Sequence, residues 1–367
     1  MRKLLSVFAA FLMGAAALGA ELPDTLYVGV KDGHVQGIAL DKAKGYMYFS
    51  FTSSFIKTDL QGNIIGTISR IQGHLGAMTL GPDGRVWASL ECKDDVIGQG
   101  IADRLGVENL RHNQSVFYVA IIDVDKIDRV GMDPEKDGVM TTVCIREACK
   151  DYEGKTYGCS GIDGITFAPR IGKCPGKKLY LYVAYGIYGD TSRTDNDNQI
   201  ILCYDVSGWK DRYETPVVFG TVPTNGPEKP RHKYFVHTGN TNWGVQNMAY
   251  DAYTGRIYLA VYKGKKDSYP NYPLFSLDVK QRPVKARPKG LEEKHETLKL
   301  SEAGLLDAPT GVRGWNFKWG STGLCPIGEG LWYISENHKD KATGIQSCTA
   351  RLYRWTGEGS KPFVARQ

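Results

Sequence analysis

Five segments of the chain share one pattern of hydrophobic and polar positions. Each begins with a short apolar strand, passes through a tight turn and continues into a second strand in which aromatic and aliphatic residues alternate at period two. The turns contain PDG, YTG and GEG, whose residues favour tight-turn geometry. The segments are residues 37–51, 77–90, 164–185, 245–262 and 322–336. The pattern therefore predicts a repeated β-hairpin.

A third strand usually follows each hairpin, as at 117–124 and 200–206. The repeating unit is then a β-meander of about four strands, which cannot bury both faces of its sheet alone. Radial stacking of such units protects them without leaving long free edges. The sequence therefore predicts an all-β protein with a β-propeller fold. We expect the strand at 25–30 to pair with the C-terminal strand at 350–355 and so close the ring.

The number of blades stays open at this point. The pattern contains five units, and long insertions separate them at 91–115, 127–160, 207–240 and 280–318. Dividing the length of the chain after the predicted leader by about 45–50 residues per blade instead gives roughly seven blades.

The first residues have the features of a secretory signal peptide. Arg2 and Lys3 precede an apolar stretch at 4–18 that is too short to span a bilayer, and small residues follow it. We predict a signal peptide at 1–20, one propeller domain at 21–367, and a secreted or periplasmic protein without a membrane span.

All eight cysteines follow this leader, and an even number in an exported chain permits disulfides. The spacing suggests three local bonds, Cys144–Cys149, Cys159–Cys174 and Cys325–Cys348. A zinc site is not expected, because no cysteine and histidine spacing of that kind occurs.

Composition narrows the classes of function. The chain is 42% hydrophobic and 23% charged, which excludes a disordered, collagen-like or coiled-coil protein. The net charge is +6, but the basic residues are scattered, so we expect no nucleic-acid partner. The chain also lacks GxSxG, HExxH, a Walker A loop and a GxGxxG that follows a strand. A mild positive charge instead suits an anionic ligand such as an acidic sugar.

Polar residues just before the first strand of each unit are the first candidates for a site, because propellers bind ligands at the mouth of the central channel. His34 and His74 occupy equivalent positions in consecutive units, and a histidine can act as a general base near neutral pH. The alternative is that both are buried and bonded to backbone carbonyls. The other candidates at these positions are Gln36, Asp163, Trp243, Gln246, Asn247 and Trp319.

A second group of candidates lies at 182–199. It consists of Tyr185, Tyr188, Arg193, Asp195, Asn196 and Asp197. An arginine offers two parallel donors to a carboxylate, and a nearby tyrosine can supply a proton. A solvated polar turn is the alternative, and a calcium site built from the last three residues is another.

Trp243 and Trp319 could stack on sugar faces or simply pack in the core. Lys263, in a tyrosine-rich loop, could approach an anionic sugar.

Several of these segments resemble a known group of enzymes. HVQGIAL, GHLGAMTL and GNTNWGVQNMAYDAYTGRIYLAVYKGKK are similar to secreted propeller enzymes that act on L-rhamnose-α-1,4-D-glucuronate linkages. These are rhamnosidases and rhamnose-glucuronate lyases, and more distantly ulvan lyases. The resemblance covers most of the chain after the leader. It implies seven blades and an acidic oligosaccharide or polysaccharide as the partner.

In the lyases a histidine removes the C5 proton of the uronate while cationic and amide groups neutralise its carboxylate, which stabilises the developing enolate. The implied residues are His74 as the base, Tyr185 or Tyr188 as the acid, and Arg193 with Gln246 or Asn247 on the carboxylate. In the rhamnosidases a single histidine acts on the opposite face of the ring, and His34 resembles it. We expect a monomer with no required cofactor, or at most a structural calcium ion.

Three hypotheses about function follow. The first is a carbohydrate-active enzyme that cleaves a rhamnose-glucuronate or similar uronate linkage, either by elimination or by hydrolysis. The second is a propeller that binds glycans or proteins without catalysis. The third is a metal-dependent, lactonase-like propeller, which would need a central cage of acidic and amide side chains.

Overall fold

The computed structural model describes residues 22–366 apart from 32, 108–113, 174–175 and 240. The predicted signal peptide at 1–20 lies outside the described residues. No helix in the described part of the chain is long and apolar enough to cross a membrane.

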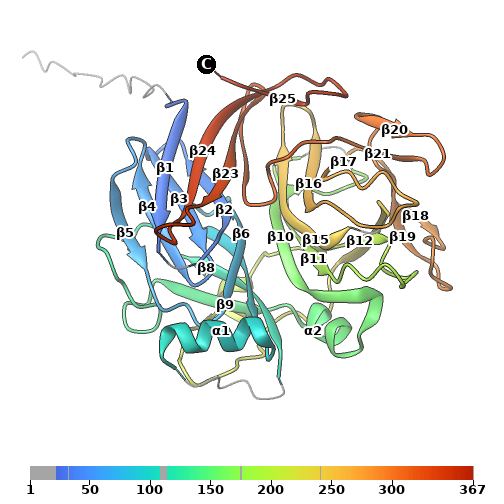
Figure 1. Cartoon of the computed structure of the whole chain (residues 1–367). Helices are drawn as coiled ribbons and strands as arrows, with labels where there is room; N and C mark the ends of the chain where they lie inside the picture. Colours follow the sequence, from blue (N-terminus) through green and yellow to red (C-terminus); the bar gives the residue numbers. More distant parts are fainter. Residues whose placement is uncertain (1–21, 32, 108–113, 174–175, 240, 367) are drawn as a thin grey trace, which may run out of the picture.

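The strands form blades around a central axis (Figure 1). The innermost strands of these blades contact one another in cyclic order, so the ring is closed. They are β2 (Val35–Asp41), β6 (His74–Leu80), β10 (Cys159–Pro169), β15 (Asn242–Asp251) and β22 (Leu324–Gly328). The β-propeller prediction is confirmed, but the ring has five blades and the expectation of seven is wrong.

The first four blades differ in width. The first is β2, β3 (Tyr46–Phe51), β4 (Ser54–Asp59) and β5 (Ile64–Ile68). The second is β6, β7 (Val86–Cys92), β8 (Val116–Ile122), β9 (Met140–Cys144) and β13 (Thr215–Pro216). The third is β10, β11 (Leu179–Ile187), β12 (Asn198–Tyr204), β14 (His232–His237), β19 (His295–Leu298) and β18 (Val284–Ala286). The fourth is β15, β16 (Arg256–Tyr262) and β17 (Leu274–Asp278).

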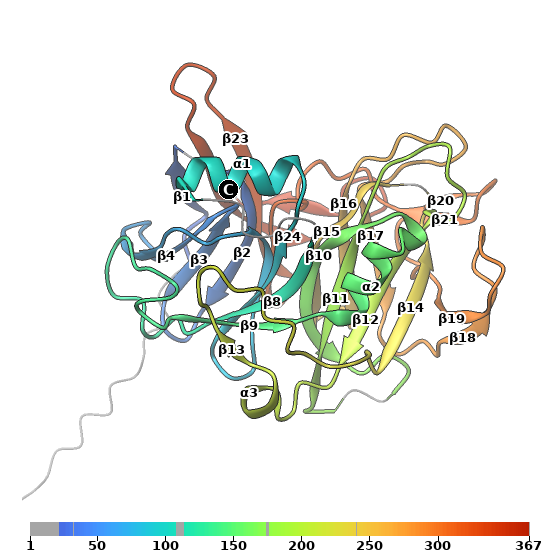
Figure 2. The same cartoon turned by 90° about the horizontal axis from the view of Figure 1, so that it is seen from below.

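The insertions explain why chain length misleads about blade number. They add edge strands, such as β13 beside β9 (Figure 2), and the separate hairpin of β20 (Leu305–Asp307) and β21 (Val312–Gly314). They also form α1 (Val96–Leu105), α2 (Arg146–Glu153), the short 3₁₀ turn η1 (Thr156–Gly158) and α3 (Trp209–Arg212). The inserted residues therefore add strands, helices and loops at the edges of the five blades and do not form further blades.

The last blade joins the two ends of the chain. β1 (Thr25–Val30) pairs with β24 (Gln346–Trp355), which pairs with β23 (Leu331–Lys339), and β25 (Phe363–Ala365) also pairs with β24. In Figure 1 the blue β1 lies beside the red β24. The predicted pairing of 25–30 with the C-terminal strand is confirmed.

Hydrophobic residues fill the spaces between neighbouring blades. Tyr48 and Leu90 belong to the cluster between the first and second blades, and Trp87 and Tyr185 belong to the next one. Three further clusters occupy the other spaces between blades. Burial of apolar surface stabilises each contact between sheets by about 25 cal/mol per Å².

Four of the inner strands carry a register irregularity at the same height. It falls between Val35 and Gly37, Leu75 and Met78, Ile162 and Ile165, and Val245 and Asn247. A Cβ at Gly37 would lie 2.9 Å from the Met78 nitrogen, so close packing at the axis requires glycine there. Bulges redirect side chains, and here they place Gln36, Asp163 and Gln246 at one end of the ring.

Two of the three predicted local disulfides do not form. The sulfur atoms of Cys144 and Cys149 lie 3.9 Å apart as thiols, well beyond the S–S bond length of about 2.05 Å. Cys325 and Cys348 are thiols on β22 and β24, which β23 separates by about 9–10 Å. Cys159 is a thiol as well, and Cys174 lies outside the described residues.

Candidate active site

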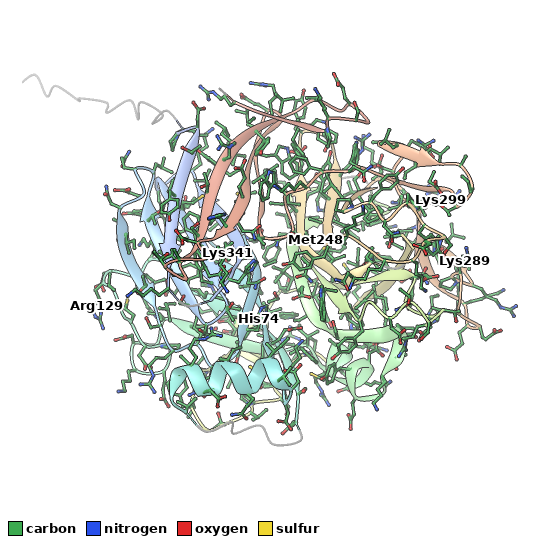
Figure 3. All side chains as sticks on the ribbon, viewed as in Figure 1. His74, Arg129, Met248, Lys289, Lys299 and Lys341 are labelled. Carbon is green, nitrogen blue, oxygen red and sulfur yellow. The ribbon has the colours of Figure 1, made fainter. Side chains whose placement is uncertain are left out.

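A pocket of about 200 Å³ opens at the end of the ring where the inner strands begin. We call it the axial pocket. Its polar lining consists of Gln36, His74, Glu91, Lys93, Asp95, Ser160, Asp163 and Gln246, and its apolar lining of Ile97, Tyr188, Trp243 and Tyr262. His74 lies near the middle of the ring in Figure 3, just above α1. The pocket therefore brings together side chains from the first four blades.

Glu91 is fixed in the floor of this pocket. It lies on β7 directly opposite His74 on β6, with 4.0 Å between Glu91 Oε2 and His74 Nδ1. The Lys93 ammonium lies 2.8 Å from the same oxygen and also donates to the Ser160 carbonyl. The backbone N–H of Ile162 donates to the other oxygen, Oε1, at 3.0 Å. Both carboxylate oxygens therefore have donors, and the group is held in one orientation.

Asp163 is held more loosely. It lies on the bulge of β10, and the Gln246 side chain donates to its Oδ2 at 3.0 Å. One donor atom each from His74, Glu91 and Asp163 lie within 4.8 Å of one another. Two carboxyl groups and an imidazole are thus close enough to act on one bound molecule.

Burial governs the charges of this group. It raises the pKa of Asp163 well above its usual range, and the neighbouring Glu91 charge raises it further. Burial also raises the pKa of Glu91, while Lys93 and the Ile162 amide oppose that change. The pKa of His74 falls to about 3 because of burial and the Lys93 charge. Burial works against the charge on Lys93, but Glu91 outweighs it and raises the pKa of the ammonium.

An aromatic wall faces these groups. Trp243 is 45% exposed and Tyr188 is 40% exposed, which is unusual for such large side chains. Trp243 has a φ of 69°, a left-handed conformation that costs energy for a bulky residue and is found at functional sites. Aromatic side chains beside a few convergent polar groups are typical of a ligand-binding pocket.

A second cavity of about 220 Å³ adjoins the first and shares Tyr188 with it. We call it the side pocket. Tyr152, Lys155, Gly158, Cys159 and Arg193 complete its lining. The Arg193 guanidinium makes two bonds to the Asp195 carboxylate, at 2.8 and 2.7 Å, and one to the Lys155 carbonyl. The guanidinium that lines the side pocket is therefore paired with a carboxylate, and the exposed Lys155 side chain lies beside it.

His34 lies at the same end of the ring as His74, because Thr52 bonds to the His34 backbone N–H and to the Leu75 N–H of β6. The position on the opposite face that the resemblance implied for His34 is therefore wrong. The His34 ring nitrogens lie 3.2 Å from the side-chain nitrogens of Gln36 and Asn337. Burial lowers its pKa.

Tyr185 does not reach either pocket. Its side chain is fully buried between blades, where its hydroxyl donates to Asp151 at 2.8 Å. Alternation along β11 turns Tyr185 into the core, whereas Tyr188 follows the end of the strand and lines both pockets. The prediction of Tyr185 as the acid is not supported by this placement, and that of Tyr188 stays a prediction.

The residues suggested for calcium are paired with cations of the protein. Asp195 binds Arg193, and Asp197 accepts bonds from the Lys266 ammonium at 2.5 Å and from the Tyr269 hydroxyl at 2.9 Å. The Asn196 side chain donates to two backbone carbonyls, and its oxygen lies 3.3 Å from Lys266. The calcium prediction therefore finds no support, because the oxygens already have cationic partners.

Three other predicted binding residues lie outside the lining of the axial pocket. Asn247 donates to the carbonyls of Gln36 and Ser321 at 2.8 Å each and so ties inner strands together. The Lys318 ammonium covers the ring of Trp319 at 4.1 Å, and Lys263 is exposed. Gln36, Trp243 and Gln246 line the axial pocket, and their role in substrate binding stays a prediction.

Sequence reasoning missed Glu91 and Lys93. A signal for them exists, because β7 reads VWASLEC and is wholly buried, so a glutamate within it requires a buried partner. Lys93 follows two residues later on the same face of the extended chain.

No family model matches the chain, and no curated protein matches it. Among solved structures it is similar to a glucose dehydrogenase (11% identity, TM-score 0.38, covering 89% of this chain and 99% of that one). It is similar to the soluble aldose sugar dehydrogenase of Escherichia coli (13% identity, TM-score 0.38, covering 89% of this chain and 99% of that one). It is also similar to a gluconolactonase from Xanthomonas campestris (10% identity, TM-score 0.30, covering 92% of this chain and 93% of that one). The resemblance to rhamnosidases and lyases stays a prediction.

Proposed function

We propose that the protein is a carbohydrate-active enzyme that hydrolyses a glycosidic bond in an acidic oligosaccharide. The axial pocket binds the sugar whose bond is cleaved, and the side pocket binds the acidic sugar next to it. The observation that carries this proposal is the grouping of Glu91, Asp163 and His74 within 4.8 Å in a pocket with an aromatic wall. Glycosidases generally use two carboxyl groups that flank the scissile bond.

The two carboxyl groups have different surroundings and therefore different roles. Lys93 and the Ile162 amide donate to Glu91, which favours the carboxylate that attacks or stabilises the anomeric carbon. Asp163 accepts a hydrogen bond from the neutral Gln246 side chain and lies on the bulge, so it is the group that gives a proton to the leaving oxygen. One oxygen each of Glu91 and Asp163 lie within 4.8 Å of each other. Separations of about 5 Å between the two carboxyl groups are typical of glycosidases that retain the anomeric configuration.

Elimination is less well supported. It requires a cation on the uronate carboxylate beside the proton that the base removes. In the axial pocket Lys93 is paired with Glu91, and Arg193, which lines the side pocket, is paired with Asp195. A base at His74 and a carboxylate at Arg193 would therefore occupy different cavities.

The side pocket supports an acidic neighbouring sugar. Arg193 and Lys155 both line it, and the Lys155 side chain is exposed. Tyr188 separates the two pockets and can contact both sugars. A neutral sugar linked to a uronate, such as rhamnose linked to glucuronate, fits an axial pocket that adjoins a side pocket lined by Arg193 and Lys155.

The test is product analysis with rhamnose–glucuronate oligosaccharides. We expect release of free rhamnose without the ultraviolet absorbance of an unsaturated uronate. Asp163→Asn and Glu91→Gln should each lower the rate about 10²–10⁴-fold, the usual contribution of such groups. Asp211→Asn is the matched control, because Asp211 is exposed on α3.

Two results would overturn the proposal. An unsaturated product would assign elimination and restore His74 as the base. Saturable binding of the oligosaccharide without any product would assign a glycan-binding propeller instead.

A further inference from the structure

We propose that His74, Glu91 and Asp163 also form a binding site for a divalent transition-metal cation such as Zn²⁺, and that the cation switches off cleavage. The binding part rests on the geometry of the three side chains alone. The inhibitory part rests on the proposed function, because it assumes that the same carboxyl groups carry out hydrolysis.

The donor atoms are suited to such a cation. His74 Nδ1 is buried and has no hydrogen-bond partner among the described residues. His74 Nδ1 lies 4.0 Å from Glu91 Oε2, and one ligand atom each of His74, Glu91 and Asp163 lies within 4.8 Å of the other two. An imidazole nitrogen with two carboxylate oxygens is a ligand set that zinc accepts, with a fourth position left for water. The axial pocket leaves room for that water.

The required movement is small. His74 Nδ1 lies 4.0 Å from Glu91 Oε2, whereas two ligands on one tetrahedral zinc lie about 3.3 Å apart, given bonds of about 2.0–2.1 Å. Asp163 can adjust, because its carboxyl group is bonded to Gln246 through one oxygen. Shifts of about 1 Å in the side-chain atoms of these residues would then bring the three ligand atoms to the spacing that zinc requires.

The Lys93 ammonium competes with a metal ion for the Glu91 carboxylate. The ammonium lies 2.8 Å from Glu91 Oε2, the oxygen that faces His74, so two cations compete for one atom. Lys93 has other partners when displaced, since it already donates to the Ser160 carbonyl and Asp95 lines the same pocket. The affinity for zinc is therefore set largely by the cost of moving Lys93.

The cluster at Asp195–Asp197 shows the contrast. There the Arg193 guanidinium bonds to the Asp195 carboxylate and the Lys266 ammonium to the Asp197 carboxylate. At the axial pocket Lys93 bonds to Glu91, while the Asp163 carboxyl group accepts from the neutral Gln246 side chain. A carboxyl group without a bonded cation favours a metal ion here rather than at the acidic loop.

A bound cation would inhibit hydrolysis for a direct reason. It takes up the Glu91 and Asp163 oxygens that the proposed reaction needs for attack and for proton donation. Removal of the cation by a chelator would restore them. The enzyme would thus lose activity when zinc is abundant and regain it when zinc is scarce.

Isothermal titration calorimetry of the untagged protein with Zn²⁺ tests the binding. We expect one site that His74→Ala and Asp163→Asn each weaken at least about tenfold, and that Lys93→Met strengthens about tenfold or more. Lys93→Gln is the second variant for the competitor, and circular dichroism verifies that each variant is folded. His338→Ala is the matched control, because His338 is exposed on β23. Cys149→Ser controls for binding to the pair of thiols at Cys144 and Cys149.

The outcomes separate this inference from the proposed function. No zinc binding by the wild type and by Lys93→Met, or binding that His74→Ala leaves unchanged and Cys149→Ser abolishes, would overturn it. Zinc binding with the expected pattern in a protein that cleaves no oligosaccharide would support the site and contradict only the hydrolase. Binding that leaves rhamnose release unchanged would overturn the inhibitory role.

Discussion

The buried ion pair of Lys93 and Glu91 should carry a large share of the local stability. Lys93→Met removes the ammonium that lies 2.8 Å from Glu91 Oε2 but keeps most of the aliphatic side chain. The side chains of Lys93 and Glu91 are 8% and 5% exposed, so water can hardly solvate the carboxylate that is left behind. Removing one partner of a buried pair costs about 3–5 kcal/mol, and we expect that loss in the free energy of unfolding.

The double variant Lys93→Met/Glu91→Gln is the matched comparison. It removes both charges at similar volume, and such replacements are often close to neutral, so it should recover at least about half of the loss. Urea unfolding followed by tryptophan fluorescence measures each free energy. A loss below about 1 kcal/mol in the single variant, or a double variant equal to the sum of the two singles, would refute a tightly coupled pair.

Four further predictions follow from named contacts. Tyr185→Phe should cost about 1–2 kcal/mol in unfolding free energy by removing the bond to Asp151, yet leave rhamnose release per folded molecule unchanged; a large loss of turnover would restore its catalytic role. Trp243→Ala should raise KM about tenfold with a smaller change in kcat, as loss of a stacking face would; an unchanged KM would contradict the sugar wall. Arg193→Ala should raise KM for a uronate-linked oligosaccharide but not for a neutral rhamnoside, and equal effects on both substrates would contradict the acidic subsite. Burial lowers the pKa of His237 below its usual 6.5, so the unfolded chain binds a proton that the folded chain does not, and stability should fall as the pH drops through about 6.5; urea unfolding at about pH 7 and pH 5 measures this, and a His237→Gln variant with an equally steep decline would contradict it.

The fold was largely predictable because strand alternation is a local property of the sequence. The hairpin units begin where the inner strands begin, and the strand at 25–30 pairs with β24 as expected. Blade number was not predictable from length, because residues at 207–240 and 280–318 became edge strands and loops. Whether an insertion builds a blade depends on which sheet edge it meets, and that is a tertiary property.

The site was predictable only in part. His74, Trp243 and Gln246 were found because unit starts converge at one end of a propeller ring. Glu91 and Lys93 lie on and just after a second strand, where the repeat does not mark functional positions. The sequence did not show which of Tyr185 and Tyr188 reaches the pocket. The alternation of side chains along β11 turns Tyr185 into the core, and the strand ends just before Tyr188, which lines the pocket.

The anomeric configuration of the first sugar released tests the central claim most directly. With Glu91 and Asp163 oxygens within 4.8 Å, proton NMR of a fresh digest should show retention of configuration, because retaining enzymes keep their carboxyl groups near 5 Å apart and inverting enzymes about 6.5–9.5 Å apart. Inversion would contradict the assignment of Glu91 and Asp163 as the acting pair. An unsaturated uronate in place of a free sugar would contradict hydrolysis itself.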